Sequence, residues 1–157
     1  MKKNYEELVE SLNGSFGLNR SEAAVELGKL RDKRAANALI DALDDPHMGV
    51  RSNAAFALGE LGSKEAVPHL VRLLADKNVR VRKSAAKALG ILKAEAAVLP
   101  LTEALSDTSY LVRKSAARSL GQIGDPGATA ALKRAALDRE RIVADTAQDA
   151  LAMLKHT

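Results

Sequence analysis

The sequence contains no cysteine and no tryptophan, and aromatic residues make up only 3% of its 157 residues. The lack of cysteine excludes disulfide bonds and thiolate chemistry. No stretch approaches the roughly 18 apolar residues of a membrane span. No apolar run typical of a secretory signal follows the lysines near the start. We therefore expect a cytoplasmic protein whose core is built from alanine, leucine and valine.

One block of sequence recurs at a fixed spacing of 31 residues. It reads RSEAAVELGKL from Arg20, RSNAAFALGEL from Arg51, RKSAAKALGIL from Arg82 and RKSAARSLGQI from Arg113. A period of this length is typical of solenoids, in which each unit buries its apolar face against its neighbours. Apolar residues recur at helical spacing in the block, and a second such pattern follows it in each unit. The sequence thus predicts one all-α solenoid domain of about ten helices.

Each unit is expected to contain a helix A, which carries the repeated block, and a helix B that follows it. Half-repeats are expected to flank the full ones. The predicted units are residues 1–19 (half), 20–50, 51–81, 82–112, 113–143 and 144–157 (half).

Glycines recur at two places in the repeat, one inside helix A and one just after it. The first lies inside the helix, where glycine costs about 1 kcal/mol relative to alanine, so we expect it to admit a close neighbouring helix. The second lies just past the helix end, where Gly62 and Gly124 are expected to be left-handed caps. Arg31 and Lys93 occupy the same place in the other two units, which predicts turns that differ in detail.

The repeated R-x-x-A-A-x-x-L-G block, a second helix of the type AVPHLVRLL and an aspartate six residues before the arginine together resemble HEAT repeats. More narrowly, the short unit resembles the phycobilisome-lyase-like HEAT class. The resemblance implies a ladder of aspartates and arginines between adjacent units. It would stop where Gly14 takes the aspartate position and Ala144 takes the arginine position. The implied ladder residues are Asp45, Arg51, Asp76, Arg82, Asp107 and Arg113.

The sequence offers no constellation that predicts catalysis. A HEAT-repeat relative, deoxyhypusine hydroxylase, holds a diiron centre on His-Glu pairs, but the matching positions here read Ser-Glu, Ser-Asn, Lys-Ser and Lys-Ser. His47, His69 and His156 have no second ligand at helical spacing on the same face. We therefore expect neither a metal nor a cofactor, and a protein that is not an enzyme.

The surface of the B helices carries our leading functional hypothesis. The resemblance implies that B helices line the concave side of the stack, and here they place apolar groups beside charged ones, as protein-binding patches do. The alternative is that the mixed charges bridge repeats, the prolines start helices and Leu99 packs between repeats. The first interpretation predicts a scaffold that binds a protein or peptide through Asp41, Pro68, His69, Arg72, Leu99, Pro100, Glu103 and Arg134.

The outward face of helix A offers an alternative function. Its basic residues lie in a row, and the net charge of +4 leaves room for an acidic partner. Such a row could follow a phosphate backbone and bind nucleic acid without sequence preference, or could simply be solvated. A third hypothesis, an auxiliary subunit in bilin attachment, rests on the family resemblance alone. The basic row consists of Lys83, Lys87, Lys114 and Arg118.

Overall fold

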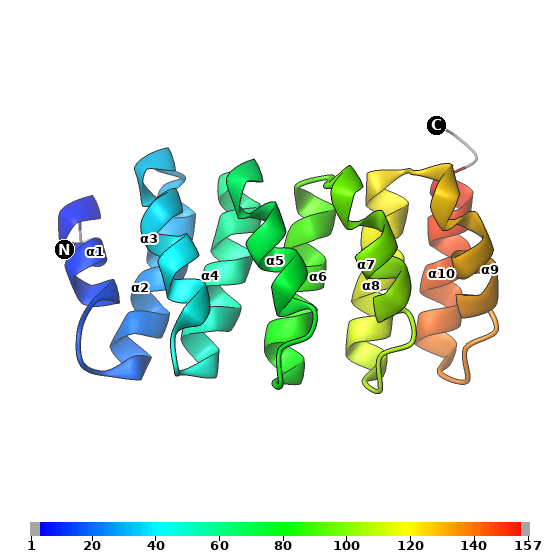
Figure 1. Cartoon of the computed structure of the whole chain (residues 1–157), viewed down its shortest axis with the longest axis horizontal. Helices are drawn as coiled ribbons and strands as arrows, with labels where there is room; N and C mark the ends of the chain where they lie inside the picture. Colours follow the sequence, from blue (N-terminus) through cyan, green and yellow to red (C-terminus); the bar gives the residue numbers. More distant parts are fainter. Residues whose placement is uncertain (1–3, 155–157) are drawn as a thin grey trace.

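The protein is a stack of helices in two layers (Figure 1). The computed structural model describes residues 4–154, and within that range it contains ten α-helices and no strand. The predicted all-α solenoid is confirmed. The A layer consists of α2 (Gly17–Leu30), α4 (Met48–Leu61), α6 (Val79–Ile91), α8 (Tyr110–Ile123) and α10 (Arg141–Leu154). The B layer consists of α1 (Tyr5–Leu12), α3 (Ala36–Asp41), α5 (Val67–Leu73), α7 (Val98–Ala104) and α9 (Thr129–Ala135).

Short 3-10 turns precede four of the B helices, and a fifth follows α3. They let the chain turn tightly after helix A, and the proline of α5 is tolerated because it lies in the first helical turn. The turns are η1 (Lys33–Ala35), η2 (Ala42–Asp44), η3 (Lys64–Ala66), η4 (Glu95–Ala97) and η5 (Pro126–Ala128).

The core is a set of aliphatic rows that follow the sequence period. Each row places the same kind of side chain at the same depth, and burial of one leucine contributes about 2 kcal/mol. The fully buried rows are Leu27, Leu58, Leu89 and Leu120 in the A helices, and Leu39, Leu70, Leu101 and Leu132 in the B helices.

The glycine inside helix A is a packing device, as predicted. A Cβ at Gly28 would lie 2.8 Å from the Cβ of Ala57, and one at Gly59 would lie 2.9 Å from the Cα of Ala88. Real side chains do not approach a backbone so closely, so glycine is required there. Helices α2 and α4, and likewise α4 and α6, therefore pack backbone to backbone, whereas Gly90 of α6 faces the side chains of Ser119 and Gln122 on α8.

The turns after helix A are more alike than the sequence predicted. Gly62 and Gly124 adopt left-handed conformations, with φ of 74° and 80°, but so do Arg31 and Lys93, with φ of 53° and 48°. After α6 the amide of Lys93 donates to Gly90 and that of Ala94 to Leu89, which is the pattern made after α4. The geometry of the turn is thus fixed by the helix end and the packing of the next helix, and two units accept the strain of a side chain there.

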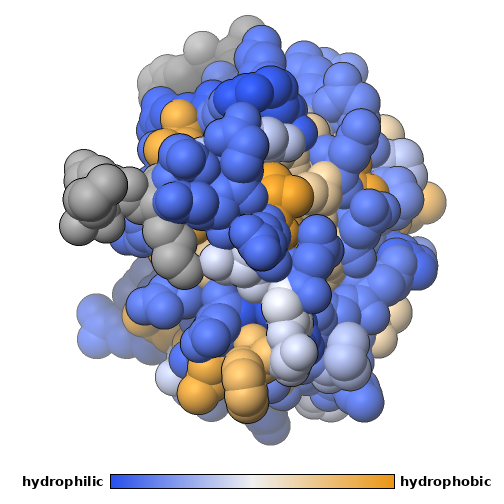
Figure 2. Space-filling view, turned by 90° about the vertical axis from the view of Figure 1, so that its left-hand side faces the viewer, coloured by the Kyte–Doolittle hydropathy of each residue, from blue (hydrophilic) through white to orange (hydrophobic). Residues whose placement is uncertain are grey.

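The N-terminal half-repeat is anchored to the first full repeat. The hydroxyl of Tyr5 donates to the carbonyl of Arg34 at 3.1 Å, and the guanidinium of Arg34 lies 4.3 Å from the ring centroid of Tyr5. Figure 2 views the stack from this end, where hydrophilic side chains cover most of the surface and apolar ones form small patches. None of the helices within residues 4–154 combines the length and the apolar composition needed to cross a membrane.

Candidate protein-binding surfaces

The arginine that opens each repeated block forms a bidentate ion pair with an aspartate 25 residues further along the chain. In the second repeat, Nε and Nη2 of Arg51 donate to the Asp76 carboxylate at 2.8 and 3.0 Å, and both side chains are less than a tenth exposed. The expected residues are therefore brought together, and the structure adds Arg20 at one end of the series and Asp138 at the other. The four pairs are Arg20–Asp45, Arg51–Asp76, Arg82–Asp107 and Arg113–Asp138, which we call the ladder.

The ladder also holds the loops between repeats. Nη1 of Arg51 donates to the carbonyls of Asp45 and Pro46, while Oδ1 of Asp76 accepts the amide of Asn78 at 2.8 Å. Arg20 makes the corresponding contact with the carbonyl of Gly14. Glycine can replace aspartate at this position because the contact uses only the backbone oxygen. Each aspartate thus secures the start of one A helix and binds the arginine of the helix before it.

Burial and hydrogen bonding act in opposite directions on the ladder carboxylates. Burial alone would raise the pKa of Asp76, but the hydrogen bonds from Arg51 and from the amide of Asn78 outweigh it, so the pKa lies below its ordinary value. Asp45 and Asp107 show the same balance. For Asp138 the hydrogen bonds from Arg113 are the largest cause of the lowered pKa. The ladder carboxylates are therefore ionised structural groups.

The residues predicted on the B face lie on four successive B helices without forming a deep hollow. Arg72 pairs with Asp44 of the preceding repeat at 2.9 Å, which matches the bridging alternative rather than a free binding group. Leu99 is 69% exposed and does not pack between repeats. A small hollow of about 260 Å³ lies between α7 and α9 and includes Arg134. Asp41, Pro68 and Glu103 are exposed, and His69 and Pro100 are half-buried.

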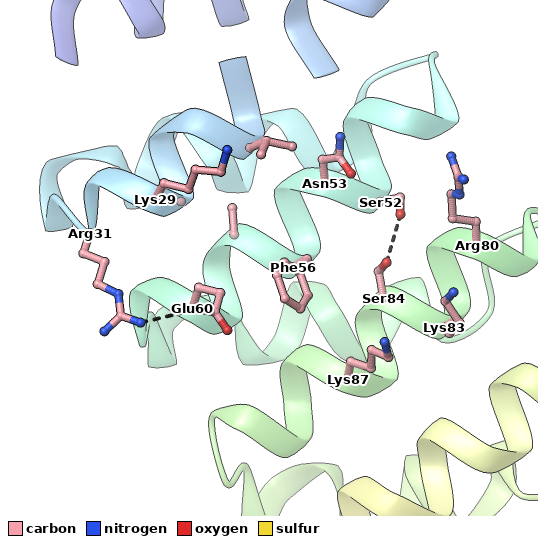
Figure 3. Close-up of a pocket in the computed structure, with 13 residues that line it drawn as sticks. Lys29, Arg31, Ser52, Asn53, Phe56, Glu60, Arg80, Lys83, Ser84 and Lys87 are labelled. Carbon is pink, nitrogen blue, oxygen red and sulfur yellow. Dashed lines mark hydrogen bonds and ion pairs between the residues drawn. The ribbon is translucent and has the colours of Figure 1, made fainter. Parts of the chain in front are cut away.

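A larger hollow lies on the A face, across α2, α4 and α6 (Figure 3). Its volume is about 590 Å³, and Phe56 of α4 lies in its middle with 42% of its surface exposed. Lys83 and Lys87 of α6 line one side. Lys29 of α2 and Arg31, just after the end of α2, lie on the other side. We call this hollow the Phe56 groove.

Hydrogen bonds between consecutive A helices fix the shape of the Phe56 groove. The hydroxyls of Ser52 and Ser84 lie 2.9 Å apart in a buried contact between α4 and α6. Nδ2 of Asn53 donates to the hydroxyl of Ser21 on α2 at 2.9 Å. The polar groups of the floor are thus satisfied within the stack, which leaves Phe56 as the exposed apolar group at its centre.

The basic row predicted on helix A forms one cluster beside this groove, made of Lys83, Lys87, Lys114 and Arg118. The pKa of Lys87 is lowered by burial and then by the positive charges of the other three residues, which lie close enough to repel the charge of Lys87. Within residues 4–154, no carboxylate forms an ion pair with any of the four. We call these four residues the basic cluster.

The sequence matches a family model described as HEAT repeats over residues 5–90 and 72–152, which together span nearly the whole chain. The chain belongs to the HEAT-repeat family. The resemblance inferred from the repeated block is thereby confirmed. No curated protein matches the sequence.

Solved structures agree with this HEAT-repeat assignment. A chain in the complex of CpcE and CpcF of phycocyanin lyase from Nostoc sp. PCC7120 is 29% identical, with a TM-score of 0.90, over 100% of this chain and 67% of that one. An engineered protein is 25% identical, with a TM-score of 0.70, over 95% of this chain and 78% of its own. A designed armadillo repeat protein in complex with the peptide (KR)4 shares the fold, at 22% identity and a TM-score of 0.72, over 94% of this chain and 80% of that one.

The two layers of this HEAT stack are packed differently. Helices α2 and α4, and likewise α4 and α6, touch through glycine and alanine backbones, whereas consecutive B helices share few contacts. The Phe56 groove lies on the closely packed A layer.

The described part of the HEAT stack contains no metal-binding group. Within residues 4–154 no three histidine, cysteine, aspartate or glutamate side chains gather at ligand distance. His47 packs on Gly17 at the start of α2, and His69 lies on the B face, far along the chain from it. His156 lies outside the described residues.

The sequence interpretation did not single out the Phe56 groove. A signal was present: the position of Phe56 reads Val25 in the first repeat, Lys87 in the third and Arg118 in the fourth. One of only two phenylalanines in the chain thus stands at an outward position, next to a run of cations.

Proposed function

We propose that the protein is a non-enzymatic scaffold that binds a protein or peptide in the Phe56 groove. The observation that carries this proposal is a hollow with an exposed aromatic centre and a basic side, built on three rigid helices. Exposed aromatic groups in preformed hollows are common anchors in protein interfaces. Because the helices are fixed by the ladder and the core, binding orders few groups of the scaffold.

The B face is the weaker site on the same reasoning. Its central cation, Arg72, already has a partner in Asp44, and its exposed apolar group, Leu99, does not line the small hollow of about 260 Å³ between α7 and α9. Isolated exposed apolar residues are ordinary features of protein surfaces. The proposal therefore moves the binding site from the B helices to the A helices.

The similarity to the phycocyanin lyase chain bears on two questions, namely whether the partner is a protein and whether the protein acts in bilin attachment. That relative is solved as a complex of two proteins, which supports a protein partner for this chain as well. A role in bilin attachment is a second candidate, and it draws on the same similarity. It predicts that the purified protein retains a bilin or a bilin-carrying protein, which visible absorbance would detect.

Capture from an extract of the source cells tests the proposal. The wild type, the groove variant Phe56→Ser and the B-face variant Arg72→Ala with Glu103→Ala are immobilised, and capture is run with and without nuclease treatment. Bound protein is identified by mass spectrometry, and bound nucleic acid is detected by gel staining of the untreated samples. We expect a discrete protein that the B-face variant retains and Phe56→Ser loses, with unchanged far-UV circular dichroism. Loss with the B-face variant alone would return the site to the B helices. Capture of nucleic acid alone would replace the proposal with the phosphate-binding alternative.

A further inference from the structure

The Phe56 groove and the basic cluster form one surface with two chemistries. Lys83 and Lys87 belong to both, since they line the groove from α6 and also face Lys114 and Arg118 of α8. The only carboxylate that lines the groove within the described residues is Glu60, and it is engaged by Arg31 at 3.5 Å. The surface therefore presents an apolar centre and unpaired positive charge.

The equivalent positions along the stack show where this charge begins and ends. From α2 to α10, the position of Lys83 reads Ser21, Ser52, Lys83, Lys114 and Asp145. The position of Lys87 reads Val25, Phe56, Lys87, Arg118 and Asp149. At these two positions the side chains thus change from apolar or neutral on α2 and α4 to basic on α6 and α8 and to acidic on α10.

We propose that this surface binds an acidic segment of a partner protein, with one large apolar side chain over Phe56 and carboxylates over the basic cluster. This inference rests on the proposed function and names the chemistry of the partner. Charge complementarity carries the assignment, because four cations without a partner in the stack gain most from a segment that supplies carboxylates. The apolar residue is needed because Phe56 lies at the centre of the groove and offers no charge to a carboxylate.

The spacing of the cluster suits a peptide. Lys83 and Lys87 lie four residues apart on one helix, so their side chains start about 6 Å apart. Lys114 and Arg118 repeat the pair on the adjacent helix, about 8–10 Å away. Carboxylates two residues apart on an extended segment lie about 7 Å from each other. A short acidic segment that crosses from α4 to α8 can therefore meet several of the four charges.

The same surface is poorly suited to a long polyanion. A nucleic acid strand that followed the stack beyond the basic cluster would meet Asp145 and Asp149 on α10, both exposed. Base stacking is also poorly supplied, because among residues 4–154 Phe56 is the single aromatic side chain that lines the groove. The acidic residues on α10 instead limit the length of the acidic stretch in the bound segment. Its carboxylates should lie only over α6 and α8.

Fluorescence anisotropy with defined peptides tests the inference. The probe is a labelled twelve-residue peptide with one leucine followed by four glutamates. The controls are the same peptide with serine for leucine, with glutamine for the glutamates, or with lysine for the glutamates, and a twelve-nucleotide oligothymidylate. We expect the probe to bind, each neutral replacement to weaken binding about tenfold or more, and the lysine peptide not to bind. Oligothymidylate binding as tight as that of the probe would overturn the inference in favour of nucleic acid.

Variants of the protein locate the binding. Lys83→Glu with Lys114→Glu should abolish binding of the acidic probe and create binding of the lysine peptide, because the charge pattern is reversed. The matched control is Lys64→Glu with Lys133→Glu, two exposed lysines outside the groove and the cluster, which changes the net charge equally and should leave the probe bound. Equal loss in both variants would show that only net charge matters and would refute the site.

Two further outcomes separate this inference from the function on which it rests. If no acidic peptide binds but the capture experiment still yields a protein lost with Phe56→Ser, the scaffold function stands and the acidic partner is refuted. Sedimentation of the protein alone addresses a second copy. A dimer that dissociates on Lys83→Glu with Lys114→Glu would assign the groove to another copy of this chain instead.

Discussion

Replacing Asp76 with alanine should strongly lower the free energy of unfolding of this protein. The substitution removes two hydrogen bonds to Arg51, at 2.8 and 3.0 Å, and one to the amide of Asn78. Because Arg51 is only 8% exposed, its charge is left without a counterion in a site that water hardly reaches. Breaking a buried pair by removing one partner costs about 3–5 kcal/mol. Arg51 keeps its two carbonyl contacts, so we expect the lower part of that range, about 3 kcal/mol.

Asp44 supplies the matched control. Its pair with Arg72 also joins adjacent repeats, at 2.9 Å, but both side chains are more than half exposed. An exposed pair is worth about 0–1 kcal/mol. Asp44→Ala should therefore cost at least 2 kcal/mol less than Asp76→Ala by the same estimates.

Urea unfolding followed by circular dichroism at 222 nm is the suitable assay, since guanidinium chloride would screen the ion pairs being compared. A double variant, Arg51→Met with Asp76→Leu, should recover much of the lost free energy of unfolding, because an apolar pair needs no counterion. The reasoning is refuted if the two alanine variants are equally stable, or if the double variant is no more stable than Asp76→Ala.

Three further predictions concern the glycines, the turns and pH. Gly59→Ala should lower the free energy of unfolding by about 1–3 kcal/mol, because the new methyl group overlaps the backbone of Ala88; addition of Ala88→Gly should restore part of it in the same urea assay, and no loss in the single variant would contradict the close approach. Lys93→Gly should raise the free energy of unfolding by about 0.5–1 kcal/mol, since φ of 48° strains a side chain; an unchanged or lower thermal midpoint would contradict this. The ladder carboxylates have lowered pKa values in the folded state, so their stabilisation is complete above the unfolded value near 4 and is lost as pH falls through the folded values. Thermal midpoints measured from pH 7 to pH 2 should fall more steeply for the wild type than for Asp76→Ala, and parallel curves would count against the linkage.

The period of 31 residues made most of the fold predictable. It fixed which positions share a face, so the internal glycines could be named before any coordinates were known. The resemblance to HEAT repeats then implied six of the eight ladder residues, all but Arg20 and Asp138. Such features depend on repeated local geometry, and every copy adds to the signal. The turn at Lys93 did not follow the same logic, because the packing of the next helix imposes a left-handed conformation whether or not the residue favours it.

The candidate site was harder to predict because it depends on differences between repeats. Phe56 interrupts its row in a single copy, and its meaning became visible only once the hollow around it was described. The distance between neighbouring helices follows from contacts such as Gly59 against Ala88, which link adjacent units and cannot be assigned from the pattern of one unit.

The ladder also makes the length of the protein adjustable. Every pair joins residues 25 positions apart, and each arginine also donates a hydrogen bond to the carbonyl of the residue six positions before it. Excision of residues 51–81 would place Arg82 six positions after Asp45, where the same contacts can form, and would set Gly28 against Ala88 as it now faces Ala57. The shortened chain should still fold as a stack, yet it would lack Phe56 and would bring Val25 next to the lysines of α6. Gain or loss of one whole unit can thus alter the binding surface while the rules that join neighbouring units are kept.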